Sequence, residues 1–372
     1  MRVLMTGGGT GGHVYPALAI AEYIKEKEPD SEIAFVGTEK GIENKLVPAA
    51  GYKLYHVEIQ GIYRSLSPKN IKTAYLIMVS PYKAKKIIKE FRPDIVIGTG
   101  GYVCWPLLRA ASSMGIPSMV HESNAYAGLA VRQVQGCVDR VLTSFEETAE
   151  RLKAKEKIVN VGNPLRINCS AYSQAEARRK LGISDGKKFV VLSFGGSLGA
   201  KGINDAAIEI MRSFSSKKTN TLHYHACGSR FYDDFLSEAR KDGLDKSQHI
   251  VISDYIFDMP LYMAAADVVI CRAGAMTLSE LAMMGKPAIL IPSPNVTDDH
   301  QYKNAKVVAD RGGAFLVKEG EEVSARVCKA VESLWADRKL RSEMSSAMSA
   351  MARPDAGEKI YSEILKLTEK KK

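Results

Sequence analysis

Residues 7–13 read Gly-Gly-Gly-Thr-Gly-Gly-His, between the apolar run Val3-Leu4-Met5 and a segment that begins near Pro16. The apolar run predicts a buried strand, and the later segment has helix composition with a proline near its first turn. A strand that turns through glycines into a helix leaves unpaired N–H groups at the helix N-terminus, where an anion can bind. We therefore expect this loop to receive an anionic ligand.

Three known loop types compete for this stretch. It matches the dinucleotide fingerprint Gly7-x-Gly9-x-x-Gly12, but the next predicted strand, residues 32–36, is not followed by the acid that binds a ribose. As a P-loop it carries His13 where a lysine is required. The third interpretation keeps His13 as a base at the mouth of a glycine loop. A tight turn without a ligand is the structural alternative.

The composition is that of a globular protein large enough for two domains. The chain has 372 residues, and 52 Lys and Arg against 42 Asp and Glu give a net charge of +10, which favours an anionic partner. No apolar run is long enough to span a bilayer, and we expect no signal peptide. The cysteines, without a CxxC pair, are predicted to be reduced packing residues rather than metal ligands; they are residues 104, 137, 169, 227, 271 and 328.

Short β-rich runs alternate with helical segments in both halves of the chain, which predicts parallel, doubly wound sheets. The pattern breaks at Gly162-Asn163-Pro164 and restarts with a second glycine turn, Gly195–Ala200. We predict twin Rossmann-like domains, 1–163 and 164–344, with a C-terminal helix of about 345–372 packing back on the first and the ligand in the cleft between them. The expected strands are 2–6, 32–36, 95–97, 118–121, 140–143, 158–161, 189–194, 222–226, 250–253, 268–270, 288–291 and 314–317.

Polar clusters follow several of these strands. After strand 268–270, Gly274 and Thr277 suit a phosphate-binding turn, and Glu280 is placed to accept two ribose hydroxyls. A capping box, Thr277-x-x-Glu280, fits the spacing equally well. Residues 298–301, Asp-Asp-His-Gln, suit hydroxyl recognition, or N-capping by either aspartate. Residues 121–124, His-Glu-Ser-Asn, end strand 118–121 and are expected to face the same cleft.

Taken together and in order, these motifs resemble the MurG family of bacterial peptidoglycan glycosyltransferases, glycosyltransferase family 28. The resemblance covers essentially the whole chain and implies a GT-B fold. It also implies inverting transfer of GlcNAc from UDP-GlcNAc to the 4-hydroxyl of the MurNAc of lipid I, forming lipid II. The matching segments are 8–13, 100–102, 121–124, 162–166, 195–200, 272–280 and 301–304.

The resemblance implies a role for each matching position. Two positions depart from the family pattern: His300 stands where a second glutamine is frequent, and Ser123 replaces a glutamine. The implied donor site consists of Thr10, Asn124, Arg166, Ser197, Ile256, Ala275, Met276, Thr277, Glu280, His300 and Gln301. The implied site for the acceptor diphosphate consists of Gly8, Gly9, Gly11, Gly12, Gly100, Gly101 and Tyr102.

Inverting transfer needs a base near the acceptor hydroxyl and stabilisation of the leaving diphosphate. Helix N-termini can hold the leaving charge, so we expect neither a metal nor another cofactor. His13 is our candidate base, since a neutral imidazole takes a proton near pH 7, and Glu122 is the competitor. Binding the acceptor diphosphate would explain His13 equally well.

The segment 69–91 mixes apolar residues with lysines. Such a pattern usually marks a core stripe and a solvated face, but it also suits an anionic bilayer surface. Because the implied acceptor is a lipid, we predict a cytoplasmic protein, peripheral on the inner face of the cell membrane, with no nucleic-acid partner and with other cell-wall synthesis proteins as candidate partners. The predicted membrane residues are Ile71, Tyr75, Leu76, Lys83, Lys85 and Lys86.

Three rival functions share parts of this pattern. A glycosyltransferase with another lipid acceptor, such as diacylglycerol, would keep the same fold. A UDP-GlcNAc 2-epimerase uses similar twin domains but needs neither an acceptor nor a lipid-facing segment. A non-catalytic nucleotide-sugar sensor is disfavoured because His13, Glu280 and Gln301 are all present.

Overall fold

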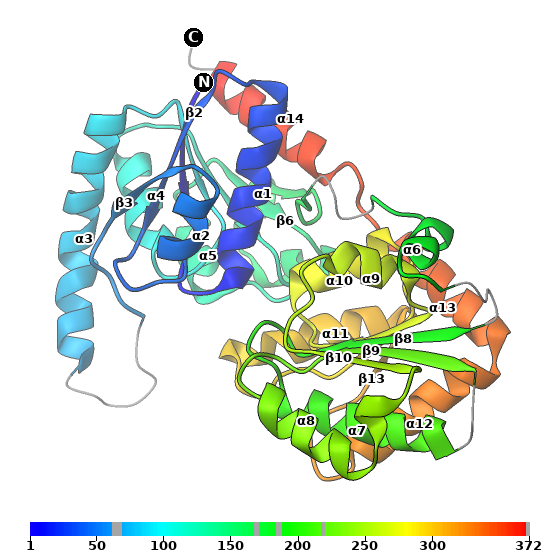
Figure 1. Cartoon of the computed structure of the whole chain (residues 1–372). Coiled ribbons are helices and arrows are strands. Elements are labelled where there is room, and N and C mark those ends of the chain that lie inside the picture. Colours follow the sequence, from blue (N-terminus) through cyan, green and yellow to red (C-terminus); the bar gives the residue numbers. More distant parts are fainter. Residues whose placement is uncertain (62–68, 167–170, 184–187, 217–219, 370–372) are drawn as a thin grey trace. The chain divides into compact units, whose positions relative to one another are not determined.

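A computed structural model describes residues 1–61, 69–166, 171–183, 188–216 and 220–369. The chain forms two compact units (Figure 1). Unit 1 comprises Met1–Arg166 and Arg353–Lys372, and unit 2 comprises Ile167–Ala352.

Unit 1 alternates strands and helices in the predicted manner. Its sheet is entirely parallel, in the order β3-β2-β1-β4-β5-β6-β7. The elements are β1 (Arg2–Thr6), α1 (Gly11–Lys27), β2 (Glu32–Gly37), α2 (Glu43–Ala49), β3 (Lys53–His56), α3 (Lys69–Phe91), β4 (Ile95–Gly98), α4 (Cys104–Ser113), β5 (Ser118–Glu122), α5 (Leu129–Val134), β6 (Arg140–Thr143), η1 (Glu146–Arg151), η2 (Lys155–Lys157), β7 (Ile158–Asn160) and α14 (Ala356–Glu369).

Apolar side chains cover both faces of this sheet, as parallel strands require. Along β1, Leu4 packs with helices α3, α4 and α5, whereas Val3 and Met5 pack with α1 and α14. The six strands predicted in this half are confirmed to within a residue at each end. The edge strand β3 was not predicted, since it is only four residues long and no residue of it is fully buried.

The C-terminal segment returns to unit 1. The region 345–372 is not one helix, because it divides at residues 351–355 into the end of α13, in unit 2, and α14. Helix α14 lies beside α1 (Figure 1), where the Tyr361 hydroxyl donates to Glu28 (2.7 Å). Arg140 pairs with the buried Glu363 at 3.0 Å.

Unit 2 repeats the architecture with a parallel sheet in the order β10-β9-β8-β11-β12-β13. Helices α7 and α12 pack on one face of it. The elements are α6 (Gln174–Lys180), β8 (Phe189–Phe194), α7 (Lys201–Ser216), β9 (Thr221–Ala226), α8 (Tyr232–Lys241), η3 (Leu244–Lys246), β10 (Ile250–Ser253), α9 (Met259–Ala265), β11 (Val268–Cys271), α10 (Ala275–Met283), β12 (Ala288–Leu290), η4 (Thr297–Asp299), α11 (His300–Asp310), β13 (Ala314–Leu316), α12 (Val323–Ala336) and α13 (Arg338–Ala350).

The strand order in each unit defines where a ligand belongs. In unit 1 the order reverses between β1 and β4, and in unit 2 between β8 and β11. Open parallel sheets bind ligands outside the carboxyl ends of the strands at such a switch point. The loops that follow β1, β4, β8 and β11 are therefore the candidate ligand loops, and all of them contain glycines quoted above.

Candidate active site

The glycine loop of unit 1 is packed so closely that side chains are excluded. A Cβ on Gly7 would lie 2.1 Å from Thr99 Oγ1, and one on Gly8 would lie 2.7 Å from Glu43 Oε1. Gly9 has φ +86°, in the left-handed region that favours glycine. The loop leads into α1 after Thr10, whose side chain forms no capping hydrogen bond. Packing therefore fixes the glycines beside the N-terminus of α1.

Glu43 holds this loop in place by hydrogen bonds, although no role for it was predicted from the sequence. Its buried carboxylate accepts from Gly9 N (3.1 Å), Thr38 N (2.9 Å) and Thr38 Oγ1 (2.9 Å). Burial alone would raise the pKa of Glu43, but the hydrogen bonds from these groups outweigh it and lower the pKa. The ionised carboxylate thus fixes the orientation of a loop more than thirty residues away in sequence.

His13 lies on the first turn of α1, half-buried against the loop that follows β4. Its Nδ1 is 3.2 Å from the carbonyl oxygen of Thr99. Since a carbonyl only accepts, Nδ1 carries the proton and Nε2 of the neutral ring is the basic nitrogen. Gly100 and Gly101 have positive φ and wrap the ring so closely that a Cβ on Gly100 would lie 2.6 Å from Nδ1. The loops at the switch point therefore hold one defined orientation and tautomer of His13.

Residues 121–124 lie differently from the prediction. Strand β5 continues through Glu122, and His121 and Ser123 are buried rather than facing a ligand. His121 Nε2 lies 3.0 Å from the carbonyl oxygen of Gly162 and 3.2 Å from Ser144 Oγ. Burial lowers the pKa of His121 to about 4, so the ring is neutral. It links β5 to Ser144 and Gly162 in the interior of unit 1.

The Glu122 carboxylate is also engaged within the chain. One oxygen accepts from the backbone and side chain of Asn124 (both 3.0 Å), and the other accepts from Gly128 N (2.7 Å). Burial raises the pKa of Glu122. This geometry favours a role in shaping the 123–128 loop, and it favours His13 over Glu122 as the base. Asn124 remains partly exposed at the carboxyl end of β5.

In unit 2 the turn between β8 and α7 depends on contact between two glycines. Gly199 has φ +80°, and Gly228, after β9, has φ +87°. A Cβ on Gly228 would lie 2.1 Å from Gly199 N, and one on Gly199 would lie 2.0 Å from the carbonyl oxygen of Cys227. This contact presents Ser197 at the exposed tip of the turn. The need for Gly228 was not predicted, because only the fold brings the two loops together.

Helix α10 begins at Ala275, after Gly274, whose φ of −66° and ψ of +136° are extended. Thr277 therefore lies inside the first turn, and the capping-box alternative is wrong. The first N–H groups of the helix, on Ala275, Met276 and Thr277, have no partner within the helix and can bind an anion. Burial raises the pKa of Glu280 to about 7, and no described residue donates to its carboxylate.

Two contacts hold the loop before α10 in place. Arg272 forms a bidentate pair with Glu319 (2.8 and 3.3 Å) and donates to the carbonyl oxygen of Ile291 (3.0 Å). The buried Asn304 donates through Nδ2 to the carbonyl oxygen of Ala273 (3.2 Å). These residues support the site rather than face a ligand.

The entry to α11 is strained. Asp298 and Asp299 have φ +55° and +51°, and Asp299 makes no capping hydrogen bond with its side chain, so the N-cap alternative is wrong there. Consecutive non-glycine residues in this region cost energy and occur preferentially at functional sites. Gln301 Oε1 accepts from Ser293 N (2.9 Å), which leaves its amide nitrogen as the donor for a ligand. His300 Nδ1 lies 2.8 Å from the carbonyl oxygen of Thr297.

The remaining predicted donor residues lie in both units. Ile256 is buried in the loop before α9, between the exposed Tyr255 and Phe257. Arg166 ends the first segment of unit 1, where it pairs with Glu22 of α1 at 3.2 Å.

Tyr102, which was predicted for the acceptor diphosphate, lies over the glycine loop. Its Cε1 is 3.1 Å from the position that a Cβ of Gly9 would occupy.

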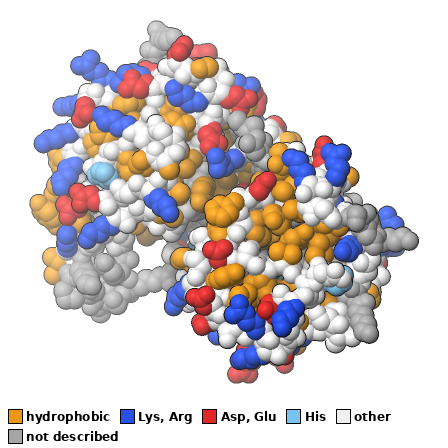
Figure 2. All heavy atoms as spheres, viewed as in Figure 1, with side chains coloured by type: hydrophobic (Ala, Val, Ile, Leu, Met, Phe, Trp, Pro, Cys, Tyr) orange, Lys and Arg blue, Asp and Glu red, His pale blue; other side chains and the backbone are white. Residues whose placement is uncertain are grey.

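Helix α3 carries an exposed apolar stripe at helical spacing: Ile71 (76 % exposed), Tyr75, Met78 and Tyr82 (70 %). Leu76 does not belong to it, because it is 3 % exposed and packs with Ile59 and Val103, so its predicted membrane role is wrong. Basic side chains gather along this edge of unit 1, with apolar and acidic side chains among them (Figure 2). Lys72 and Lys83 both pair with Glu58 at 3.3 Å.

Within the described ranges, no helix is both long and apolar enough to cross a bilayer, and no group of acidic, histidine and cysteine side chains could hold a metal ion. Cys104, Cys227 and Cys271 are buried, which fits the predicted packing role, and Cys169 lies outside the described residues.

Two parallel α/β units, each with its glycine turn at a switch point, define the GT-B class of glycosyltransferase folds, as predicted. The chain belongs to glycosyltransferase family 28: residues 3–143 match the glycosyltransferase family 28 N-terminal domain and residues 190–360 the corresponding C-terminal domain. The resemblance inferred from the motifs is thereby confirmed.

Two relatives and one crystal structure are similar to this chain over nearly its full length. The chain is 42 % identical over 368 residues, 99 % of this chain and 100 % of the relative, to the UDP-N-acetylglucosamine--N-acetylmuramyl-(pentapeptide) pyrophosphoryl-undecaprenol N-acetylglucosamine transferase of Caldanaerobacter subterraneus. It is 43 % identical over 366 residues, 98 % of each chain, to the protein of the same name from Acetivibrio thermocellus. The crystal structure of MurG from Acinetobacter baumannii has a TM-score of 0.78 at 28 % identity, with 98 % of this chain and 99 % of that chain covered.

Proposed function

We propose that this protein transfers GlcNAc from UDP-GlcNAc to the 4-hydroxyl of the MurNAc of lipid I, forming lipid II, with inversion at the anomeric carbon. The observation that carries the proposal is that relatives named for an N-acetylglucosamine transfer of this kind match 98–99 % of the chain. The match therefore includes both the glycine loop of unit 1 and the α10 segment of unit 2. No resident cofactor takes part in the proposed reaction.

Unit 2 supplies most of the donor site. The N–H groups of Ala275, Met276 and Thr277, with Ser197, hold the pyrophosphate at the positive end of α10. The Glu280 carboxylate accepts the two ribose hydroxyls; a desolvated carboxylate that no described residue donates to is suited to this task. The backbone of Ile256 meets the uracil, and the amide of Gln301, with His300, contacts the sugar.

Unit 1 supplies the acceptor site and further donor contacts. The glycine loop with Gly100, Gly101 and Tyr102 binds the acceptor diphosphate through backbone N–H groups. His13 Nε2 removes the proton of the attacking hydroxyl, because its Nδ1–H is committed to Thr99. Thr10, Asn124 and Arg166 assist in holding the donor. As UDP leaves, its developing charge is stabilised at the N-terminus of α10.

The exposed face of α3 provides contact with the membrane. Ile71, Tyr75, Met78 and Tyr82 insert at the headgroup boundary, and Lys83, Lys85 and Lys86 attract anionic lipids, which keeps the enzyme peripheral on the inner face of the cell membrane. Replacing the three lysines with glutamate should weaken sedimentation with phosphatidylglycerol vesicles, and Met78→Ser should weaken it without changing charge. Unchanged sedimentation of both variants would refute this part of the proposal.

Steady-state kinetics with a short-chain lipid I analogue, together with UDP-GlcNAc binding, test the roles assigned to His13 and Glu280. His13→Ala should lower kcat by roughly 10²–10⁴-fold, the range of general base catalysis, and leave the dissociation constant of UDP-GlcNAc unchanged. Glu280→Gln should instead raise that dissociation constant. If His13→Ala retained full kcat, His13 would not be the base.

A further inference from the structure

A depression lies in unit 2, away from the loops that follow β8 and β11. Its volume is about 1020 Å³, and its lining includes Lys188, Asp267 and Pro287, which immediately precede β8, β11 and β12. It therefore opens at the amino ends of these strands, whereas the loops proposed to bind the donor follow the carboxyl ends of β8 and β11. The proposed reaction uses none of these residues.

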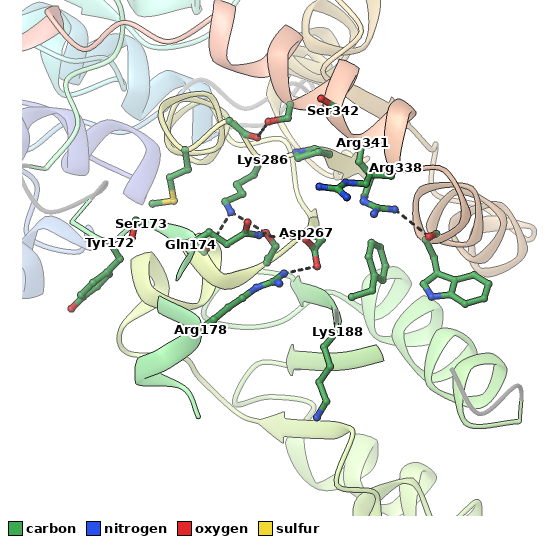
Figure 3. A pocket seen from close by; sticks show the side chains of 18 of the residues that line it. Tyr172, Ser173, Gln174, Arg178, Lys188, Asp267, Lys286, Arg338, Arg341 and Ser342 are labelled. Carbon is green, nitrogen blue, oxygen red and sulfur yellow. Dashed lines mark hydrogen bonds and ion pairs between the residues drawn. The ribbon is translucent and has the colours of Figure 1, made fainter. Parts of the chain in front are cut away.

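The lining of this depression is strongly basic. Arg178, Lys286, Arg338 and Arg341 surround it with Asp267 as the acidic residue (Figure 3), while Lys188 points away from this cluster. Arg178 neutralises Asp267 through an ion pair of 2.6 Å. Three cationic side chains therefore remain without a carboxylate partner among the described residues.

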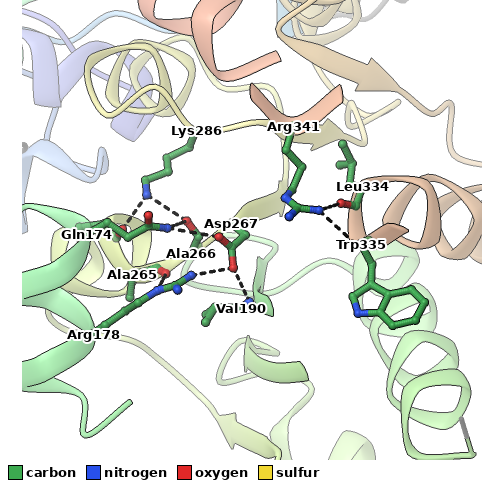
Figure 4. A network of polar contacts seen from close by, with 11 residues as sticks. Gln174, Arg178, Val190, Ala265, Ala266, Asp267, Lys286, Leu334, Trp335 and Arg341 are labelled. Carbon is green, nitrogen blue, oxygen red and sulfur yellow. Dashed lines mark hydrogen bonds and ion pairs between the residues drawn. The ribbon is translucent and has the colours of Figure 1, made fainter. Parts of the chain in front are cut away.

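Lys286 is the most unusual of these residues, because it is only 7 % exposed. Its ammonium donates to the carbonyl oxygens of Ala264 (2.6 Å) and Ala266 (2.9 Å) at the end of α9 (Figure 4). Burial lowers its pKa to about 8. Buried charges are normally paired with an opposite charge, and here the direct partners are neutral carbonyl groups.

A purely structural explanation accounts for part of this charge. Lys286, Arg178 and Gln174 bind the carbonyl groups that end α9, and Arg341 binds those of Leu334 and Trp335 near the end of α12 (Figure 4). Each helix terminus carries only about half a negative charge, so about two positive charges remain after both are satisfied. Arg338 is exposed, has no described partner and binds neither terminus.

We propose that this depression is a second ligand site of the protein and binds a phosphate-bearing anion between Lys286 and the two arginines of α13. A doubly charged phosphate matches the residual charge, and guanidinium groups bind phosphate oxygens with paired N–H donors. The hydroxyl of Ser342, on the same turn of α13 as Arg341, adds a neutral donor. The phosphate belongs either to a soluble compound or to a lipid headgroup.

Tryptophan fluorescence gives a local measurement of this site. Trp105 and Trp335 are the only tryptophans, and the half-exposed Trp335 lines the depression. In a Trp105→Phe background, with UDP at saturation to fill the donor site, pyrophosphate should change the Trp335 emission saturably. Arg338→Glu should raise the dissociation constant roughly tenfold or more, as expected when one charge-assisted contact becomes repulsive.

Lys339→Glu is the matched control, because it makes the same charge change one residue along at an exposed position that lines no described pocket. It should leave the pyrophosphate dissociation constant within about twofold of the parent. Arg338→Gln repeats the test if the reversal unfolds the protein. If pyrophosphate gives no signal, vesicles that contain phosphatidic acid, a lipid phosphomonoester, are the second probe, and a response lost only in the Arg338 variants assigns the site to a lipid phosphate. Equal behaviour of Arg338 and Lys339 variants with both probes, or no response to either, would overturn the proposal.

Discussion

The pKa of Glu280 makes donor binding sensitive to pH in a calculable way. Burial raises this pKa to about 7 in the free protein, and only the carboxylate form can accept both ribose hydroxyls. At pH 6 about one tenth of the molecules carry the carboxylate, so the apparent affinity for UDP-GlcNAc should be about tenfold weaker than at pH 8. The affinity for UDP-GlcNAc therefore falls as pH falls, because protonation of Glu280 turns one of its two acceptor oxygens into a hydroxyl donor.

Isothermal titration calorimetry between pH 5.5 and 8.5 measures this effect. UDP-GlcNAc is the appropriate ligand because its pyrophosphate diester does not titrate in that range. Glu280→Gln should weaken binding at pH 8 by about 1.5–3 kcal/mol, the value of hydrogen bonds to a charged group, and should remove the dependence on pH. A pH-independent affinity in the parent protein, or the same slope in Glu280→Gln, would refute the assignment of Glu280 to the ribose.

Three further predictions concern the supporting structure. Gly228→Ala should destabilise unit 2 by more than about 2 kcal/mol in urea unfolding and weaken donor binding, because its Cβ would lie 2.1 Å from Gly199 N; an unchanged midpoint would contradict this packing. Glu43→Gln should lower the free energy of unfolding by about 1–3 kcal/mol and reduce kcat while UDP-GlcNAc affinity stays unchanged, since Gly9 loses a charged acceptor. The buried rings of His223 and His225 share Ser193 Oγ (2.7 Å each), and burial lowers the pKa of His223 to about 3, so urea stability should fall as pH drops from 6.5 towards 4; a flat profile in the parent, or the same slope in His223→Gln, would argue against this.

The sequence predicted the fold well because its signals are local. Buried strands such as β1, β6 and β8 begin and end at the expected residues, since an apolar run bounded by glycines or charges specifies a buried parallel strand by itself. The strand β3 carries no such signal. Its residues are half-exposed or exposed at the sheet edge, so its formation depends on pairing with β2.

Candidate site residues could be predicted where an ionisable side chain lies in a loop at the end of a strand. They were missed where their role depends on a contact with a residue distant in sequence. His13 and Glu280 are recognisable because an ionisable residue follows a glycine turn. Glu43 and Gly228 are not, because their partners lie about thirty residues away and only the fold brings them together. His121 shows the opposite failure: its position at a strand end suggested a ligand contact, but β5 extends further and buries it.

Acceptor-dependent transfer of GlcNAc can be measured in a single product assay. Labelled UDP-GlcNAc is incubated with the protein with and without a short-chain lipid I analogue, and the products are separated and analysed by NMR. We expect a labelled disaccharide-lipid only when the analogue is present, with a β-linkage that shows inversion of the α-linked donor. Labelled N-acetylmannosamine formed without an acceptor, or UDP-GlcNAc that binds without transfer of GlcNAc to the analogue, would refute the proposed transferase activity.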